Sequence, residues 1–256
     1  MINVEAVKRV VDFYPPMGRL ARKARDTWVE ISSKTENRIA ATTKVVDRMN
    51  LRHRRFEKAF NTGVWSSTGE SMSGSGSSLK ATEKLRAVLP GVLQQLGVKT
   101  LLDVPCGDWN WMSRLELPID RYIGGDIVTP LIHQNQKKFS DPRRTFQIID
   151  LCVDDLPTAD LLLCRDALIH FSNFDISRAI ANVKRAEIAY IATTTFTATE
   201  VNTDQITGIP WRHLNLEAAP FSFPEPLIRI VDNFSRHDQI IAIWRVADLP
   251  KVPTES

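Results

Sequence analysis

The stretch TLLDVPCGDWNWM at residues 100–112 decides the fold class, because it has the pattern of a buried strand that runs into a tight turn. Strand ends of this kind often hold a nucleotide. Nucleotide-binding turns usually contain several glycines, but this one contains only Gly107, with Pro105 and Trp109 where glycines would be expected. The turn therefore raises the question of which ligand it is built for.

Apolar strands and amphipathic helices alternate around this turn. We predict strands at residues 100–104, 121–126, 145–150, 159–166 and 187–196, and helices at 79–96, 111–115, 129–139 and 175–186. Apolar strands separated by helices indicate a parallel sheet covered on both faces. Two more strands, at 226–234 and 239–246, are close enough in sequence to pair antiparallel. The prediction is an α/β fold: a doubly wound, mostly parallel seven-stranded sheet with a C-terminal antiparallel hairpin.

A length of 256 residues fits one large domain with an added segment, or two small domains. The composition, 43% apolar and 25% charged, is that of a soluble globular protein. We predict a helical N-terminal extension at 1–60, a Ser/Gly-rich loop at 61–78 and the α/β domain at 79–250. No apolar run approaches the roughly 20 residues that span a bilayer, and no signal peptide is evident. Three cysteines without C-x-x-C spacing suit a reducing compartment, so we expect a cytoplasmic protein and assign no metal ligands.

Charge is distributed unevenly along the chain. Residues 1–60 carry 14 Lys and Arg against 7 Asp and Glu, a net +7, whereas the remainder carries 19 against 23, a net −4. A basic arm of this kind would suit peripheral contact with a membrane or with a partner protein. The two signs are interspersed without a dense basic block, which favours a solvated helical extension. We do not expect nucleic acid as a partner.

Charged residues close each of the first four predicted strands. They are Asp103, Asp126, Asp150, and the pair Arg165 and Asp166. A carboxylate at the end of a buried strand is costly unless a partner satisfies it, and this edge is where such sheets bind ligands. Asp126 follows Asp103 by 23 residues, near the offset at which an acid reaches a nucleotide ribose. Asp150 would accept a hydrogen bond from an adenine amino group, and Leu151 would pack on the ring.

The turn itself discriminates among adenosine cofactors. A dinucleotide needs G-x-G-x-x-G to hold its pyrophosphate, and here Asp108 would repel phosphates. No Walker lysine is present either. An adenosine ligand without phosphates and with positive charge at its other end fits better. S-adenosylmethionine carries both a sulfonium and an ammonium group, which Asp103 and Asp108 would approach.

Four segments together resemble motifs I to IV of the class I, Rossmann-like S-adenosylmethionine-dependent methyltransferases: LLDVPCGDWNWM, YIGGDIV, FQIIDLCVDDLP and DLLLCRDALIHF. The resemblance covers roughly residues 79–246. It implies that Asp103 and Gly107 contact the methionine moiety, Asp126 the ribose and Asp150 the adenine. Pro105 and Trp109 depart from the usual D-x-G-x-G-x-G, and Trp109 would wall the site. The cofactor-binding residues that we assign are Asp103, Pro105, Gly107, Asp108, Trp109, Asp126, Ile127, Asp150, Leu151 and Arg165.

The Ser/Gly-rich segment ESMSGSGSSLKATEKL has two interpretations. It is either a flexible linker or a functional loop whose N–H groups and hydroxyls close over the cofactor's carboxylate. We favour the functional loop, because an amphipathic helix follows it at once.

Methyl transfer is an in-line displacement that needs alignment, desolvation and a base for the acceptor's proton. We predict His170 as that base, with Asp166 four residues earlier as its orienting acid. The structural alternative is that His170 packs in a helix that Asp166 caps. Arg165 would hold an anionic substrate or pair with a neighbouring acid.

The long segment at residues 193–226 is polar and aromatic, and long loops in compact domains are commonly functional. We predict that Asn202, Asp204, Trp211 and Arg212 line an acceptor pocket, with the Trp211 ring as a face on which sugars stack. The alternative is a surface loop held by its prolines.

We therefore expect a soluble S-adenosylmethionine-dependent methyltransferase that methylates an oxygen of a small polar or carbohydrate acceptor, with a nitrogen as the alternative atom. The carbohydrate expectation also rests on a resemblance of W-x-x-x-G-E-S-x-S-G-x-G-S and DVPCGDWNWM to bacterial methyltransferases of the polysaccharide-modifying kind. One rival is a nucleic-acid methyltransferase that uses the basic arm, although N/D-P-P-Y/F is absent. Another is a catalytically silent binding protein of the same fold. A nicotinamide dehydrogenase is least favoured, for want of pyrophosphate glycines.

Overall fold

The structure is a computed structural model that describes residues 51–66, 69–232 and 238–251. All of them belong to one compact unit, Met49–Ser256. The helices predicted within residues 1–50 lie outside the described residues.

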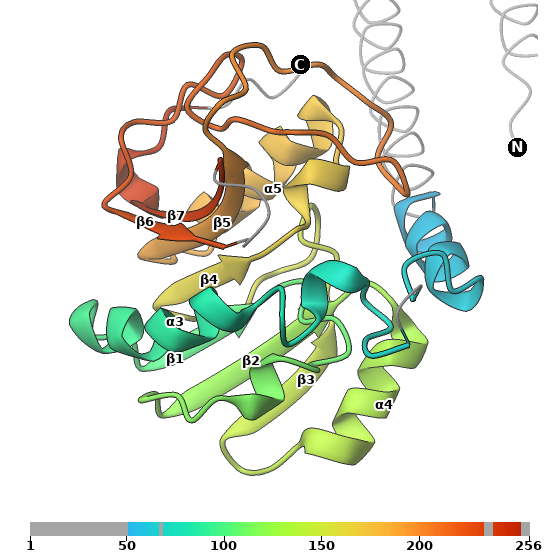
Figure 1. The fold of residues 1–256 in the computed structure, drawn as a ribbon. Helices are drawn as coiled ribbons and strands as arrows, with labels where there is room; N and C mark the ends of the chain where they lie inside the picture. The colour runs from blue at the N-terminus through green and yellow to red at the C-terminus, as the bar shows by residue number, and fades with distance from the viewer. Residues whose placement is uncertain (1–50, 67–68, 233–237, 252–256) are drawn as a thin grey trace, which may run out of the picture. The chain divides into compact units, whose positions relative to one another are not determined.

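Seven strands form one mixed sheet (Figure 1). Its strands are β1 (Thr100–Asp103), β2 (Arg121–Asp126), β3 (Arg144–Ile148), β4 (Leu161–Cys164), β5 (Tyr190–Phe196), β6 (Ile228–Val231) and β7 (Gln239–Arg245). Their order is β3-β2-β1-β4-β5-β7-β6, and the first five strands along the chain are parallel. β7 runs antiparallel to both β5 and β6. The predicted fold class is confirmed, and the hairpin joins the sheet through its second strand.

Helices cover both faces of the sheet. Three of them are α3 (Glu83–Gln95), α4 (Thr129–Phe139) and α5 (Asn173–Arg185). Alternate residues of the central strands point to opposite sides: Leu101 packs in one apolar cluster with α3, and Leu102 packs in another with α5. This two-sided burial explains why the central strands are apolar throughout. The carboxyl ends of the parallel strands are left at one edge, where the site forms.

Several elements are shorter than their apolar patterns predict. β3 ends at Ile148 and β4 at Cys164, so Asp150, Arg165 and Asp166 lie in the loops beyond these strands. α3 begins at Glu83 rather than at residue 79, and the predicted helix at 111–115 is a 3-10 turn, Met112–Arg114. In its turn, the Asp150 carboxylate accepts from the Cys152 N–H, whereas the Asp166 carboxylate accepts from the side chains of Thr194 and Gln239.

A helix over residues 51–61 packs on this sheet domain. Its Arg52, Phe56 and Ala59 are buried. These residues recur at intervals of three and four, as expected for one buried helix face. Within the described part of the chain, no helix combines the length and apolar character needed to cross a membrane.

Candidate cofactor and acceptor site

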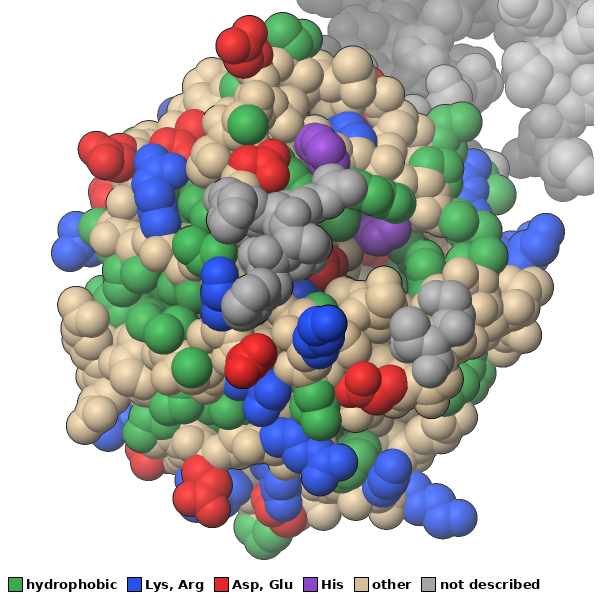
Figure 2. All heavy atoms as spheres, viewed as in Figure 1, with side chains coloured by type: hydrophobic (Ala, Val, Ile, Leu, Met, Phe, Trp, Pro, Cys, Tyr) green, Lys and Arg blue, Asp and Glu red, His purple; other side chains and the backbone are tan. Residues whose placement is uncertain are grey.

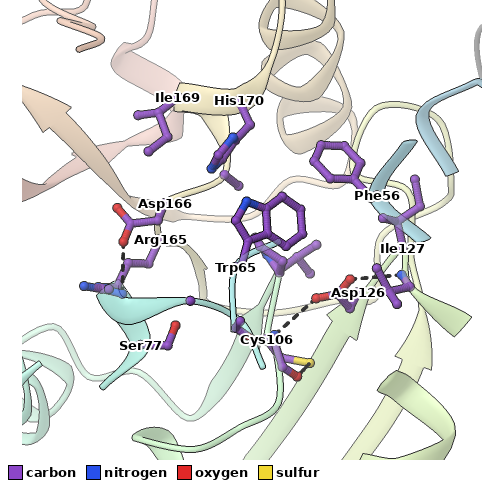
Figure 3. A pocket seen from close by; sticks show the side chains of 18 of the residues that line it. Phe56, Trp65, Ser77, Cys106, Asp126, Ile127, Arg165, Asp166, Ile169 and His170 are labelled. Carbon is purple, nitrogen blue, oxygen red and sulfur yellow. Dashed lines mark hydrogen bonds and ion pairs between the residues drawn. The ribbon is translucent and has the colours of Figure 1, made fainter. Parts of the chain in front are cut away.

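A cavity of about 520 Å³ lies beyond the carboxyl ends of the parallel strands. Its walls come from the turn after β1, the end of β2, the loops after β3 and β4, residues 72–77 and the helix at 51–61. In Figure 3, Arg165 and Asp166 lie on one side of the cavity and Asp126 lies on the other. Trp65 lies between these two sides, next to His170. The cavity is therefore built from segments distant in sequence that meet at the edge where this fold binds ligands.

Asp126 closes β2 and is almost fully buried. Its Oδ1 accepts a hydrogen bond from the Val128 N–H at 3.0 Å, and its Oδ2 accepts one from the Gly107 N–H at 3.2 Å. Burial raises the pKa of this carboxyl to about 6, although the two backbone donors act against the rise. The carboxylate thus ties the β2 end to the turn after β1 and borders the cavity.

Asp103 closes β1 and is buried beside the cavity. The Tyr122 hydroxyl donates to its Oδ2 at 2.6 Å. Burial raises the pKa of Asp103 to about 7, against the opposing effect of the Tyr122 hydrogen bond. A buried carboxylate with one neutral donor and space beside it suits a cationic group of a ligand.

Asp150 has a partner that sequence reasoning missed. The Nε and NH2 groups of Arg52 donate to Asp150 Oδ2 at 3.1 and 2.9 Å, while the Cys152 N–H donates to Oδ1 at 3.0 Å. Asp150 and Leu151 both line the cavity, as does Arg52. The carboxylate is therefore fixed in place, and Oδ1 keeps acceptor capacity for a further donor.

Gly107 packs against the Ser/Gly-rich loop. Its φ is +56°, and a Cβ there would lie 2.4 Å from Ser73 Oγ, so both the backbone and the space require glycine. The adjacent Asp108 accepts hydrogen bonds from Ser71 Oγ at 3.0 Å and from the Met72 N–H at 2.7 Å. The Asp108 N–H in turn donates to Ser73 Oγ at 2.8 Å. The loop is clamped onto the turn, which contradicts its interpretation as a flexible linker.

Trp109 differs from its predicted position in the wall of the site. It is buried, with its ring 4.8 Å from Phe139 and 5.6 Å from both Tyr122 and Phe146. It is not among the described residues that line the cavity, and neither is Asp108. The apolar cluster beneath the turn is large enough to take the indole, so Trp109 anchors the turn from below.

Arg165 sits in a buried ion-pair network. Its Nε donates to both oxygens of Asp232 at 3.1 and 3.0 Å, and its NH1 pairs with Asp166 Oδ2 at 3.1 Å. Burial alone would lower the pKa of Arg165, but the carboxylates of Asp166 and Asp232 outweigh it and raise the pKa. Arg165 was predicted either to hold an anionic substrate or to pair with a neighbouring acid. The structure shows it paired with two acids, Asp166 and Asp232.

His170 also lines the cavity, in the 3-10 turn Leu168–His170. Its Nδ1 lies 3.0 Å from the Pro210 carbonyl oxygen, which can only accept, so Nδ1 carries the proton and Nε2 keeps its lone pair. Burial lowers the pKa of the imidazole and favours this neutral form. The Trp65 ring packs against the imidazole at 5.8 Å, nearly edge to face (Figure 3).

The predicted pairing of His170 with Asp166 does not occur. The Asp166 carboxylate instead accepts hydrogen bonds from Thr194 Oγ1 at 3.1 Å and Gln239 Nε2 at 3.2 Å, beside its pairing with Arg165. Asp166 has φ +53°, so its backbone turns away after β4 and aims the carboxylate at β5 and β7. A backbone carbonyl, that of Pro210, orients His170 in its place.

The residues predicted to bind the acceptor divide into two kinds. Trp211 lines the cavity and is half exposed. The side chains of the other three form hydrogen bonds with backbone groups. Asn202 Nδ2 donates to the Asn215 carbonyl at 2.7 Å, and Asp204 accepts from the Asn173 N–H at 2.7 Å. Arg212 NH1 donates to the Phe171 carbonyl at 2.6 Å. They are not among the described lining residues. They shape the loop that presents Trp211.

Several lining residues were not predicted. Among them are Arg52, Phe56, Phe60, Trp65 and Phe196. Trp65 begins the W-x-x-x-G-E-S pattern, which was a usable signal. Arg52 and Phe56 lie in a segment whose interspersed charges resemble an ordinary solvated helix, and no local pattern sets them apart.

No protein-family model and no curated protein matches the chain. Among solved structures it is similar to magnesium protoporphyrin IX methyltransferase from Synechocystis, with 18% identity over 46% of this chain and 57% of that one, at a TM-score of 0.39. It is also similar to human N-acetylserotonin methyltransferase, with 13% identity over 75% of this chain and 66% of that one, at a TM-score of 0.43. It is similar as well to the methyltransferase domain of a bacterial Hen1 protein, with 11% identity over 64% of this chain and 98% of that one, at a TM-score of 0.49. The match spans little more than half of the first of these proteins.

Proposed function

We propose that this chain is an S-adenosylmethionine-dependent methyltransferase. More particularly, we propose that it methylates an oxygen of a small polar or carbohydrate acceptor. The observation that carries the proposal is that the carboxylates of Asp103, Asp126 and Asp150 meet, in one cavity, a neutral histidine whose Nε2 carries no proton.

The charge of the cavity favours a cationic ligand. Its described lining contains four carboxylates and two guanidinium groups, those of Asp103, Asp126, Asp150 and Asp166 and of Arg52 and Arg165. Both guanidinium groups are already paired with carboxylates. A pyrophosphate would meet unpaired negative charge here, whereas a sulfonium and an ammonium would be attracted.

Each lining group would have a distinct task toward the cofactor. Asp126 would accept hydrogen bonds from the ribose hydroxyls, and Asp150 Oδ1 would accept one from the adenine amino group. Asp103 would hold the ammonium group. The N–H groups and hydroxyls of residues 73–77, which line the cavity beside Gly107, would hold the carboxylate. The bound cofactor supplies a methyl group on a sulfonium, activated for in-line displacement.

His170 would act as the general base. Because its Nδ1 donates to the Pro210 carbonyl, Nε2 is available to take a proton from an acceptor hydroxyl. The low pKa of the imidazole keeps it unprotonated near neutral pH. The aromatic rings of Trp65 and Phe196, both in the lining, would exclude water from the reacting atoms.

The exposed ring of Trp211 supports the carbohydrate part of the proposal. It stands at the cavity with half of its surface exposed, supported by the His213 ring at 5.5 Å and the Phe196 ring at 6.5 Å. A flat, partly exposed indole suits the apolar face of a sugar ring, and a neutral base suits a hydroxyl acceptor.

Calorimetric titration with S-adenosylhomocysteine tests the core of the proposal, and we expect its affinity to depend on pH. Asp126 and Asp103 must be ionised to accept from the ribose and hold the ammonium, yet burial raises their pKa values to about 6 and about 7. The affinity should therefore weaken roughly tenfold or more between about pH 8 and about pH 5.5. Absence of binding at about pH 8, where both carboxyls are ionised, would refute the proposed function.

The clamp of the Ser/Gly-rich loop leads to a second prediction. Asp108→Ala removes the acceptor for Ser71 and Met72, so the loop should lose its fixed position over the turn. We expect S-adenosylhomocysteine to bind roughly tenfold more weakly, by calorimetry. Asp155→Ala is the matched control, because its side chain is fully exposed and should leave the affinity unchanged. Equal affinity of the Asp108 variant and the wild type would exclude this role for the loop.

The rival functions predict different experimental results. Figure 2 shows acidic and basic side chains interspersed on the face that it presents, without one continuous basic surface. A nucleic-acid methyltransferase would instead require binding of nucleic acid with a steep salt dependence. A silent binding protein would bind the cofactor but convert none of it to S-adenosylhomocysteine with any acceptor.

A further inference from the structure

Arg52 lies at the centre of a buried hydrogen-bond network. This network begins at Asp150 in the wall of the cavity and continues away from the cavity to Asp175. Its guanidinium is 2% exposed and donates to Asp150 through two nitrogens and to Asp175 Oδ1 through NH1 at 2.8 Å. Asp175 belongs to the first turn of α5. One cation thus joins a carboxylate in the adenosine side of the cavity to the start of a helix.

The network continues from α5 into the loop that carries His170's partner. Asp175 Oδ2 accepts a hydrogen bond from Thr207 Oγ1 at 2.5 Å, and Thr207 Oγ1 accepts one from the Ser172 N–H at 2.8 Å. Arg55 NH1 donates to the Thr207 carbonyl at 2.7 Å. Helix 51–61 therefore holds Thr207 both directly and through Asp175.

Thr207 stands next to the contacts that orient His170. The Gly208 N–H donates to the His170 carbonyl at 3.0 Å, and His170 Nδ1 contacts the Pro210 carbonyl. The Arg212 N–H donates to the Ile169 carbonyl at 3.1 Å. Hydrogen bonds therefore link Asp150 to the loop beside His170 in one connected set, and such buried sets resist independent movement of their members.

We propose that Arg52 and Thr207 are positioning residues, which couple occupancy of the adenosine side to the order of residues 204–212 and hence to the placement of His170. This inference rests on the proposed function, because it takes the adenine to contact Asp150. A ligand that engages Asp150 fixes Arg52, Asp175 and Thr207 in turn. The base is then held more firmly when the cofactor is bound than when it is absent.

Hydrogen exchange measured by mass spectrometry tests the coupling without an acceptor. On the full chain, saturating S-adenosylhomocysteine should slow exchange of peptides spanning residues 204–212 by roughly fivefold. In Thr207→Val, which removes the hydroxyl and keeps the shape, we expect the affinity to stay within about twofold while that protection is lost. Arg52→Lys, which keeps the charge but not the fork of donors, should also lose it.

Two further variants separate positioning from a general loss of structure. Thr199→Val is the matched control on the same loop, since no hydrogen bond of its hydroxyl occurs among the described residues, and it should keep the protection. Thr207→Ser should restore it, because the hydroxyl returns. Binding without slower exchange in the wild type, or full protection in Thr207→Val, would overturn the inference. Absence of binding by the wild type would instead overturn the proposed function, and this inference with it.

Discussion

Asp126→Ala is expected to weaken S-adenosylhomocysteine binding on the order of 100-fold, because two hydrogen bonds to a charged acceptor are lost. The variant also frees the Gly107 and Val128 N–H groups, which Asp126 now holds at the cavity wall. Calorimetry at about pH 8, where the carboxyl is ionised, gives the full difference. An affinity equal to that of the wild type would remove Asp126 from the site.

Asp160→Ala is the matched control for Asp126→Ala. Its carboxylate also accepts from two backbone N–H groups, those of Lys99 and Thr100 at 2.8 and 2.7 Å, but at the opposite edge of the sheet. It should lower the free energy of unfolding and leave the affinity unchanged.

Asp126→Asn adds a pH signature. The native pKa of about 6 lies above the usual value of 3.8 for an aspartate. The stability that this shift contributes is therefore fully present below about pH 3.8 and is lost as the pH rises through 6. The free energy of unfolding of the Asn variant, relative to the wild type, should therefore improve over this range while binding stays weak.

His170→Asn should lower the rate of methyl transfer by roughly 10²- to 10⁴-fold with little change in cofactor affinity. The Asn amide can still donate to the Pro210 carbonyl, so the loop keeps its hydrogen bond while the base is lost. Transfer of labelled methyl to a panel of sugars and polysaccharides would measure the rate. His133→Asn, on the exposed side of α4, is the control.

The pH dependence of that rate provides the second readout for His170. The neutral imidazole is the active form, and burial lowers its pKa from 6.5. At saturating cofactor and acceptor, the wild-type rate should therefore be level above about pH 6.5 and fall below it, with a midpoint under that value. A variant that keeps wild-type activity would exclude His170 as the base.

The sequence was sufficient to predict those parts of the fold that depend on local pattern. The apolar strands and the helix at 129–139 were predicted well, because burial on both faces requires long apolar runs and a covering helix shows a helical period. Asp103, Asp126 and Asp150 were placed at the cavity for the same reason: the carboxyl ends of parallel strands meet at one edge.

Contacts between distant segments could not be predicted in this way. The partner of Asp150 lies 98 residues away in Arg52, and nothing in the local composition distinguishes Arg52 from the solvated arginines around it. The positions of Trp109 and Asp166 depended on backbone conformation, since both have positive φ, +56° and +53°. A positive φ redirects a side chain, and only glycine signals it clearly in a sequence.

The compact unit of the structure includes the helix at 51–61. Composition places a boundary after residue 60 or 78, yet the buried guanidinium of Arg52 neutralises Asp150 and Asp175, both 12% exposed or less. A chain trimmed at either boundary would leave two carboxylates in apolar surroundings without their counter-ion, at a cost of about 3–5 kcal/mol. Shortened versions for expression should therefore start before Leu51, and any recombination of this domain with others must carry that helix along.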